Sequence, residues 1–189
     1  MHQLHIKSTF LPLAAGDLND REKDEALESL MFLKEKRDGS VKGKACVNGQ
    51  KQRLGSSKED ATLPTVLLKA VLITSVIDTY EGIEVEIVDM PGSFLTFDQD
   101  EVINMTIKGK LAEVIVKTTP EVYQNYIAIE KGEMVLYVQI LKAIYGCLCS
   151  ALLLYRKLMD DLESIGLELN PCNTCVVKNM IDGKQFTIT

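Results

Sequence analysis

The chain has 189 residues, of which 46% are hydrophobic and 25% are charged, and its net charge is −6. This composition is ordinary for a globular protein and excludes wholesale disorder and a collagen-like fibre. The longest uncharged apolar run, about residues 144–155, is too short to span a bilayer, and the first residues lack the basic and apolar pattern that predicts a secretory leader. We therefore expect no membrane partner and a cytoplasmic or nuclear location, where the five cysteines stay reduced.

The distribution of charge is more informative than its sum. Residues 34–53 contain seven lysines and arginines but only two acidic residues, so this segment carries +5 and the rest of the chain carries −11. A basic segment in an acidic chain is typical of local contact with phosphate groups. The alternative is a solvated hairpin whose lysines keep the protein soluble.

The first third of the chain predicts a helix followed by a hairpin. We expect residues 1–18 to be poorly ordered, and we expect a helix over residues 19–30 because Asn19 or Asp20 and Glu22 resemble a capping box. Strands over residues 31–37 and 41–47 flank the turn dipeptide Asp38-Gly39. Alternate residues of a strand share a face, so Lys42 and Lys44 should point the same way. The polar residues 50–61 predict a loop.

The rest of the chain alternates helices with strands. Helical spacing follows Pro64 and ends at Gly82, and a strictly alternating run over residues 83–89 predicts a strand. Further strands are expected over residues 102–107, 126–130, 135–139, 175–178 and 185–189, and a helix with one broad apolar stripe over residues 143–164. This mixed order predicts an α+β fold with a largely antiparallel sheet backed by helices.

Candidate chemical groups are few. Asp89 ends the strand over residues 83–89 directly before a Pro-Gly break, a position where a carboxylate can bind a hard cation such as Mg²⁺, although a turn residue is the alternative. Four cysteines (Cys147, Cys149, Cys172 and Cys175) form closely spaced pairs, but Cys147 and Cys149 lie on a predicted helix and point to different sides of it, which argues against zinc. Both histidines are near the N-terminus, so no Ser/His/Asp triad is expected.

Four segments in order resemble the reverse transcriptase region of copia-type retrotransposon polyproteins. Residues 88–95 (Val-Asp-Met-Pro-Gly-Ser-Phe-Leu) are similar to the first catalytic motif of that family, and residues 143–146 (Ala-Ile-Tyr-Gly) are similar to its Leu-Tyr-Gly segment. Residues 170–177 are similar to its Asp-x-Cys-Val strand entry, and residues 34–49 to its basic fingers hairpin. The resemblance covers about residues 18–189 and implies the fingers and part of the palm of a polymerase, over residues 19–189.

The resemblance also implies roles for individual residues. Asp89 would ligate catalytic Mg²⁺ with help from the Met90 carbonyl, and Phe94 would be the steric gate that selects deoxynucleotides. Lys42 and Lys44 would meet the triphosphate of the incoming nucleotide. The implied partners are an RNA or DNA template–primer and dNTPs, and the implied reaction is RNA-directed DNA polymerisation by two-metal catalysis.

The chain departs from the family at several positions. The Tyr-Val-Asp-Asp motif, which holds the other two metal carboxylates, would follow residues 185–189, where this sequence stops; we therefore expect a truncated segment that is inactive as an isolated chain. Cys149 and Leu152 stand where the family has Gln and Arg. In the palm, the strand over residues 185–189 should pair beside residues 83–89. Two alternatives stay open: a non-catalytic nucleic-acid-binding remnant, and an unrelated α+β protein.

Overall fold

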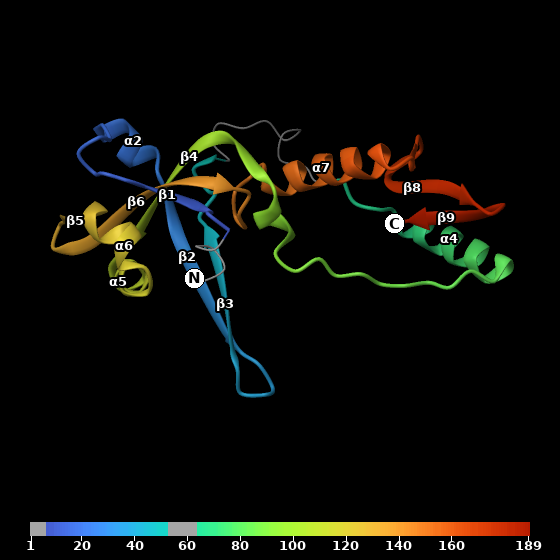
Figure 1. Ribbon diagram of the computed structural model, residues 1–189, viewed down its shortest axis with the longest axis horizontal. Helices are drawn as coiled ribbons and strands as arrows, with labels where there is room; N and C mark the ends of the chain where they lie inside the picture. The colour runs from blue at the N-terminus through green and yellow to red at the C-terminus, as the bar shows by residue number, and fades with distance from the viewer. Residues whose placement is uncertain (1–6, 53–63) are drawn as a thin grey trace. The chain divides into compact units, whose positions relative to one another are not determined.

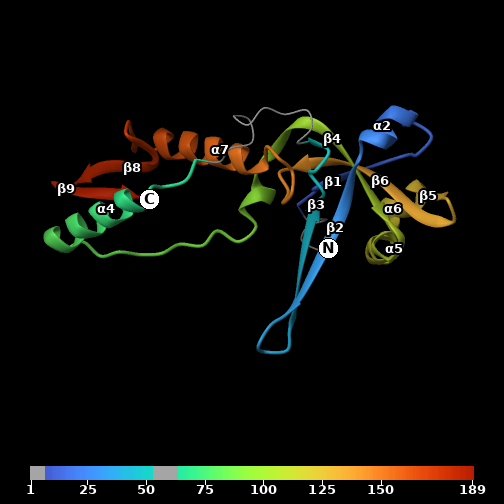
Figure 2. The same ribbon diagram turned by 180° about the vertical axis from the view of Figure 1, so that it is seen from behind.

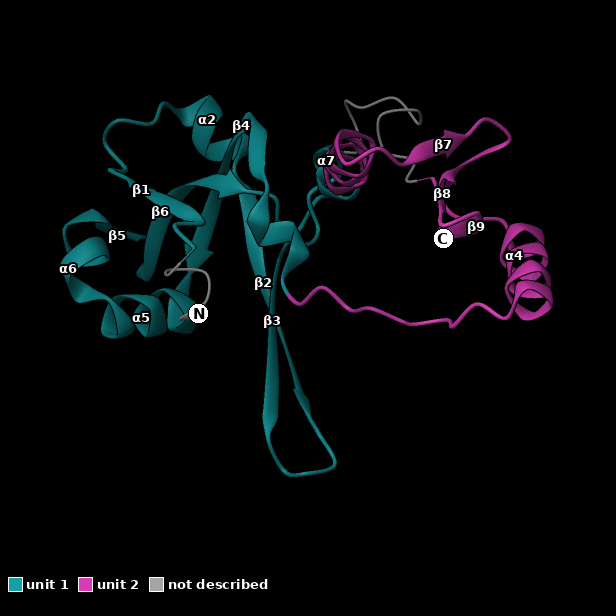
Figure 3. Ribbon diagram, turned by 45° about the vertical axis from the view of Figure 1, so that its right-hand side comes forward, with its two compact units in different colours: residues 1–61, 92–151 teal, residues 62–91, 152–189 magenta. Residues whose placement is uncertain are grey.

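The computed structural model describes residues 7–52 and 64–189. The chain folds into two compact units (Figure 3): unit 1 comprises residues 1–61 and 92–151, and unit 2 comprises residues 62–91 and 152–189. Both contain helices and antiparallel strands, which confirms the predicted α+β class. Within the described ranges, no helix combines the length and the apolar character needed to cross a membrane.

Unit 1 is built on a six-stranded sheet (Figures 1 and 2). Its strands are β1 (Phe10–Leu13), β2 (Leu27–Glu35), β3 (Val41–Val47), β4 (Asp98–Lys108), β5 (Ile127–Glu130) and β6 (Glu133–Lys142), in the order β1-β6-β4-β2-β3, with β5 also paired to β6. Strands β2 and β4 run parallel, and the other pairs are antiparallel. The expectation of poor order over residues 1–18 is wrong for β1, because this short apolar run pairs with the buried strand β6.

Helix α2 (Asp20–Glu25) begins at the predicted capping box. The Asn19 side chain accepts the backbone N–H of Glu22, and the Glu22 carboxylate accepts the backbone N–H of Asn19. The helix ends five residues earlier than predicted because Ala26 and Leu27 are buried, and Leu27 already pairs with β4 as the first residue of β2. Tertiary burial thus overrides a helical pattern in a short segment.

The predicted hairpin forms, although its first strand runs from Leu27 to Glu35 rather than over residues 31–37, and its loop sets the register. Gly39 adopts φ +78°, its N–H donates to the Lys36 carbonyl, and the Lys36 N–H donates to the Ser40 carbonyl. This is a three-residue loop with a left-handed glycine rather than a two-residue turn. Beyond Met31 the hairpin is exposed on both faces and projects from the sheet as a two-stranded arm (Figure 1).

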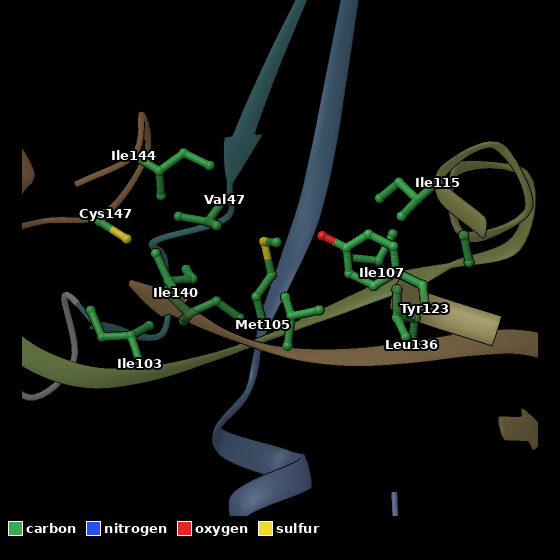
Figure 4. Close-up of a cluster of buried hydrophobic side chains, with 13 residues drawn as sticks. Val47, Ile103, Met105, Ile107, Ile115, Tyr123, Leu136, Ile140, Ile144 and Cys147 are labelled. Atoms are coloured by element: carbon green, nitrogen blue, oxygen red, sulfur yellow. The ribbon is translucent and has the colours of Figure 1, made fainter. Parts of the chain in front are cut away.

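The core of unit 1 lies between the sheet and two helices, α5 (Gly109–Thr118) and α6 (Pro120–Tyr123). The sequence patterns did not indicate either helix. The short 3₁₀ helix η3 (Gln124–Tyr126) follows α6. Ala112 and Ile115 of α5 and Tyr123 of α6 pack against β4 and β6 (Figure 4). The buried cluster consists of Leu27, Val47, Ile103, Met105, Ile107, Ala112, Ile115, Tyr123, Leu136, Val138, Ile140, Ile144 and Cys147. The cluster extends from the sheet to Ile144 and Cys147, which lie in the segment that follows β6.

Unit 2 contains α4 (Leu68–Glu81), most of α7 (Ser150–Ser164), and a three-stranded antiparallel sheet of β7 (Glu168–Asn170), β8 (Asn173–Ile181) and β9 (Lys184–Ile188). Helix α4 ends at Gly82 as predicted, with φ +65° and the Ile83 N–H bonded to the Asp78 carbonyl. The Tyr155 hydroxyl of α7 donates to the Thr174 carbonyl of β8. The β8–β9 turn at Asp182-Gly183 has φ of +52° and +77°, a two-residue turn as its sequence predicts.

Three predictions about residues 83–189 are wrong. Residues 83–90 form no strand, and Ile87 is 95% exposed, so the alternating pattern has neither a partner strand nor a buried face here. The predicted pairing of residues 185–189 with residues 83–89 is accordingly not formed, and β9 pairs with β8. The predicted helix over 143–164 begins only at Ser150, because Gly146 has φ +94°, a conformation that a helix cannot contain.

Candidate nucleic-acid interface

Three side chains from separate segments of unit 1 meet at one aromatic ring. The Lys44 ammonium of β3 lies 3.8 Å from the centroid of the Tyr145 ring, and the Phe94 ring lies 4.4 Å from it, tilted by 57°. The first contact is a cation–π pair and the second is a tilted aromatic pair. We call Lys44, Phe94 and Tyr145 the Tyr145 cluster. It brings together two residues predicted as nucleotide-binding and a third from the Tyr-Gly segment.

Tyr145 is positioned by close backbone packing against the end of β3. The Val47 N–H donates to the Tyr145 carbonyl at 2.8 Å. A side chain at Gly146 would place its Cβ 2.0 Å from the Val47 carbonyl oxygen, and one at Gly49 would place its Cβ 2.2 Å from the Gly146 carbonyl oxygen. Glycine is therefore required for the approach. Val47 lies beside Ile144 and Cys147 in the core (Figure 4), which fixes the turn that presents Tyr145.

Phe94 is held by a turn at the entrance to β4. It lies on the 3₁₀ helix η2 (Ser93–Thr96), which follows Gly92 at φ +67° and is closed by the Leu95 N–H donating to the Gly92 carbonyl. The Ala143 N–H donates to the Phe97 carbonyl at 2.9 Å, so the η2 turn is bonded to the segment that carries Tyr145. The ring is half-buried and packs on Tyr145.

One face of the hairpin continues the cluster outward. Lys34 lies directly opposite Lys42, and Phe32 lies directly opposite Lys44. Opposed residues and alternate residues of a strand share a face. All four side chains are exposed. We call Phe32, Lys34, Lys42 and Lys44 the basic face.

No acidic side chain neutralises the basic face within the described residues. Glu35 alternates onto the opposite face of the hairpin, which also bears Leu33 and Val41. Asp38 bonds the hydroxyl and the backbone N–H of Ser40, which lowers the pKa of its carboxyl group and keeps it charged in the loop. None of the four ion pairs among the described residues includes Lys34, Lys42 or Lys44. Opposed like charges without counterions destabilise a strand pair, and a bound anion relieves this repulsion.

The two remaining predicted site residues belong to unit 2. Asp89 and Met90 are exposed and lie on the extended stretch of residues 83–90, whereas Phe94, Lys42 and Lys44 belong to unit 1. Across residues 7–52 and 64–189, no three His, Cys, Asp or Glu side chains gather at metal-binding distance. Asp89 supplies a single carboxylate. The described residues therefore form no Mg²⁺ ligand set around it, and no catalytic step can be derived from Asp89.

Sequence reasoning missed three residues of this surface. Tyr145 was part of a recognised segment but had no assigned role, and Phe32 and Lys34 were not singled out. The basic composition of residues 34–53 indicated Lys34, but its pairing with Lys42 depends on the register of the hairpin, which only the loop geometry determines. The meeting of Phe94 and Tyr145 depends on the tertiary bond between Phe97 and Ala143.

The buried thiols take no part in this surface. Cys147 is buried against Ile144 in the core, and burial raises the pKa of its thiol to about 12. Burial likewise raises the pKa of Cys46. Both thiols stay protonated and act as small apolar side chains. Comparison with known proteins adds no assignment: no family model, curated protein or solved structure matches this chain.

Proposed function

We propose that the chain is a fingers-and-palm segment of a copia-type reverse transcriptase, in which unit 1 provides the surface for the template–primer and the incoming nucleotide. The observation that supports this most is the Tyr145 cluster. Its members come from three of the segments that resemble the family: the basic hairpin, the first catalytic motif and the Tyr-Gly segment. A nucleotide site shared by several segments requires that their side chains meet at one place, and three of the segments that resemble the family meet at the Tyr145 ring.

The charge of the hairpin supports a phosphate-binding role. Lys42 and Lys44 project from the same face as Lys34, and none of them has an acidic partner in the described residues. Lysine ammonium groups bind phosphates as point charges and release counterions when they do so. Binding of a primer–template should therefore weaken steeply as the salt concentration rises.

Salt-dependent binding tests this proposal. The affinity of the purified chain for a fluorescent RNA–DNA primer–template, measured by anisotropy from 50 to 300 mM KCl, should give a linear log–log plot. Lys42→Gln should lower the magnitude of its slope by about 0.7–0.9, the values for neutralising one phosphate of an unpaired strand or of a duplex. Lys117→Gln, which removes the same charge from the exposed end of α5, is the matched control and should leave the slope unchanged. Salt-independent or absent binding would favour an unrelated α+β protein.

Nucleotide addition separates the polymerase segment from a binding remnant. We expect no processive synthesis by the isolated chain with Mg²⁺ and dNTPs, because Asp89 is a single carboxylate and metal ions supply most of the charge stabilisation in phosphoryl transfer. Robust extension of a primed template by this chain would overturn that expectation. Salt-dependent binding together with a dNTP-dependent gain in primer–template affinity would favour the polymerase segment, whereas binding that ignores dNTPs would favour a non-catalytic remnant.

A further inference from the structure

The strongest feature that the proposed function does not account for is an aromatic side chain in the middle of the basic face. Phe32 is 59% exposed, yet it lies directly opposite Lys44 and two residues from Lys34 on the same strand. A solvated lysine surface has no need of a phenyl ring, and its exposure is unfavourable in the free protein. The ring is available for stacking because no aromatic partner covers it among the described residues.

We infer that the basic face is a binding track for single-stranded nucleic acid, with Phe32 as a base-stacking residue. Proteins that bind unpaired strands combine lysines or arginines for the backbone with aromatic rings on which bases stack. Along this face, Lys34 and Lys42 come first, then Phe32 and Lys44, and Lys44 lies on the Tyr145 ring, which is itself 38% exposed. Lysine and aromatic side chains therefore follow one another along this face, from the loop end of the hairpin to the Tyr145 cluster.

The dimensions of the hairpin suit an unpaired strand better than a duplex. Alternate residues of a strand are about 7 Å apart, and opposed residues in this type of pair are about 5.5 Å apart. Lys34, Lys42 and Phe32 thus occupy a patch one or two nucleotides wide. Bases in a duplex are stacked on each other and cannot also stack on Phe32, whereas an unpaired template base can. The inference rests on the proposed function and names the part of the template–primer that this face takes.

The opposite face of the same hairpin provides an internal control. Leu33 is the next residue along β2, is 71% exposed and points away from the basic face. Substituting it removes a similar apolar area at the same place along the arm but leaves the lysines and Phe32 in position. A general hydrophobic or stability effect would appear in both variants, and stacking would appear only at Phe32.

The test uses the full chain, a single-stranded RNA and a single-stranded DNA containing 2-aminopurine, and a blunt RNA–DNA duplex, each measured over the same range of salt concentration. Phe32→Ala should weaken binding of a single strand about five- to 150-fold, the range that alanine substitution of a stacking residue produces. It should also abolish protein-induced quenching of 2-aminopurine. Phe32→Tyr should restore both signals, and Leu33→Ala should match the native chain. The RNA and DNA arms show which strand chemistry is preferred.

The outcomes separate this inference from the proposed function. If the native chain binds the duplex with the expected salt dependence but Phe32→Ala binds single strands like the native chain, the stacking role is wrong and the proposed function stands. If neither duplex nor single strands bind in a salt-dependent way, both are wrong. Circular dichroism of the variants checks the fold, which should be unaffected because Phe32 and Leu33 lie outside the buried core.

Discussion

Units 1 and 2 are similar in secondary structure but very different in packing. Unit 1 buries a continuous cluster between a six-stranded sheet and its helices, and it contains positions where two backbones touch through glycine. In unit 2, α4 has no buried residue, although Leu68, Leu72, Val76 and Tyr80 are all apolar and exposed. Helix α5 therefore contributes buried residues to the core of unit 1, whereas α4 contributes none in unit 2.

This difference shows what an apolar pattern determines and what it does not. An apolar side chain stabilises a fold only when a neighbour removes it from water. In unit 1, α5 finds that neighbour in β6. In unit 2, Leu72 and Val76 of α4 and Ile87 stay exposed in the described structure, whereas Val71 and Ile77 are half-buried. We expect the two units to differ accordingly in thiol reactivity and in their response to core truncation, and further experiments test the contacts within unit 1.

The largest contrast is expected in thiol chemistry. Cys147 of unit 1 has a pKa raised to about 12 by burial, from a usual 9.0, so at pH 8 its reactive thiolate is about a thousandfold rarer than for an ordinary thiol. Cys172 of unit 2 is exposed. Iodoacetamide labelling followed by mass spectrometry should modify Cys172 within minutes and Cys147 only after unfolding. Comparable labelling of both cysteines in the folded chain would contradict the burial of Cys147.

The same raised pKa makes stability depend on pH. Below pH 9 both the folded and the unfolded states keep the Cys147 proton, and its contribution to the free energy of unfolding is constant. Above pH 9 the unfolded thiol ionises while the folded thiol stays protonated, so stability falls as the pH rises toward 12. In the Cys147→Ala variant this part of the decrease should be missing.

The next contrast is in the free energy of unfolding that each unit loses when an apolar side chain is truncated to alanine. Leu136→Ala, at a fully buried position of β6, should lower the free energy of unfolding by about 2–5 kcal/mol. Leu72→Ala in α4 makes the same chemical change at a position that is 58% exposed, and should cost less than about 0.5 kcal/mol. Urea unfolding followed by circular dichroism measures both. A large loss from Leu72→Ala would show that α4 is covered in solution.

Glycine substitutions test the backbone contact beneath Tyr145. Gly146→Ala combines a strained φ of +94° with a Cβ 2.0 Å from the Val47 carbonyl oxygen, so we expect a loss of about 2–4 kcal/mol. Gly39→Ala in the hairpin loop has a similar φ of +78° but open space around its Cβ, and should lose only about 1–2 kcal/mol. Equal losses in the free energy of unfolding would mean that the backbone at Val47 of β3 moves away from residue 146 at little cost. Nuclear magnetic resonance of the Val47 amide would show whether its bond to Tyr145 survives.

The smallest expected effect is the coupling inside the Tyr145 cluster. A double-mutant cycle with Phe94→Ala and Tyr145→Ala should give a coupling free energy of about 0.5–1.5 kcal/mol, the value typical of a tilted aromatic pair. Phe94→Ala paired with Leu33→Ala should give none, because Leu33 lies on the other face of the hairpin. A coupling near zero for the first pair would place the two rings apart in solution.

Local chemistry predicted the ends and turns of elements well. The Asn19–Glu22 capping box, the Gly82 terminus and the Asp182-Gly183 turn all form as their sequences indicate, because each depends on a few neighbouring residues. Long-range packing was not predictable in this way. The apolar stripe predicts a helix from residue 143, but the left-handed Gly146, packed against Val47, delays the start of the helix to Ser150.

The candidate site shows the same difference between what local sequence predicts and what depends on longer-range structure. Lys42 and Lys44 could be placed on one face from alternation alone. Their partners could not, because a two-residue turn at Asp38-Gly39 would have put Lys42 opposite Glu35 and Lys44 opposite Leu33. The three-residue loop shifts the register by one and places Lys34 and Phe32 there instead. One loop residue therefore decides between a neutralised hairpin and a basic face.

The strand order of unit 1 has a consequence for the order of events during synthesis. The β2–β3 hairpin pairs residues close in sequence and can close within microseconds of leaving the ribosome. Strand β1 and most of β4 gain their sheet partner only with β6, which ends at Lys142. At about 5–20 residues per second this delay is roughly five to twenty seconds. For that time the nascent chain presents a formed, positively charged hairpin while the core that will anchor it does not yet exist.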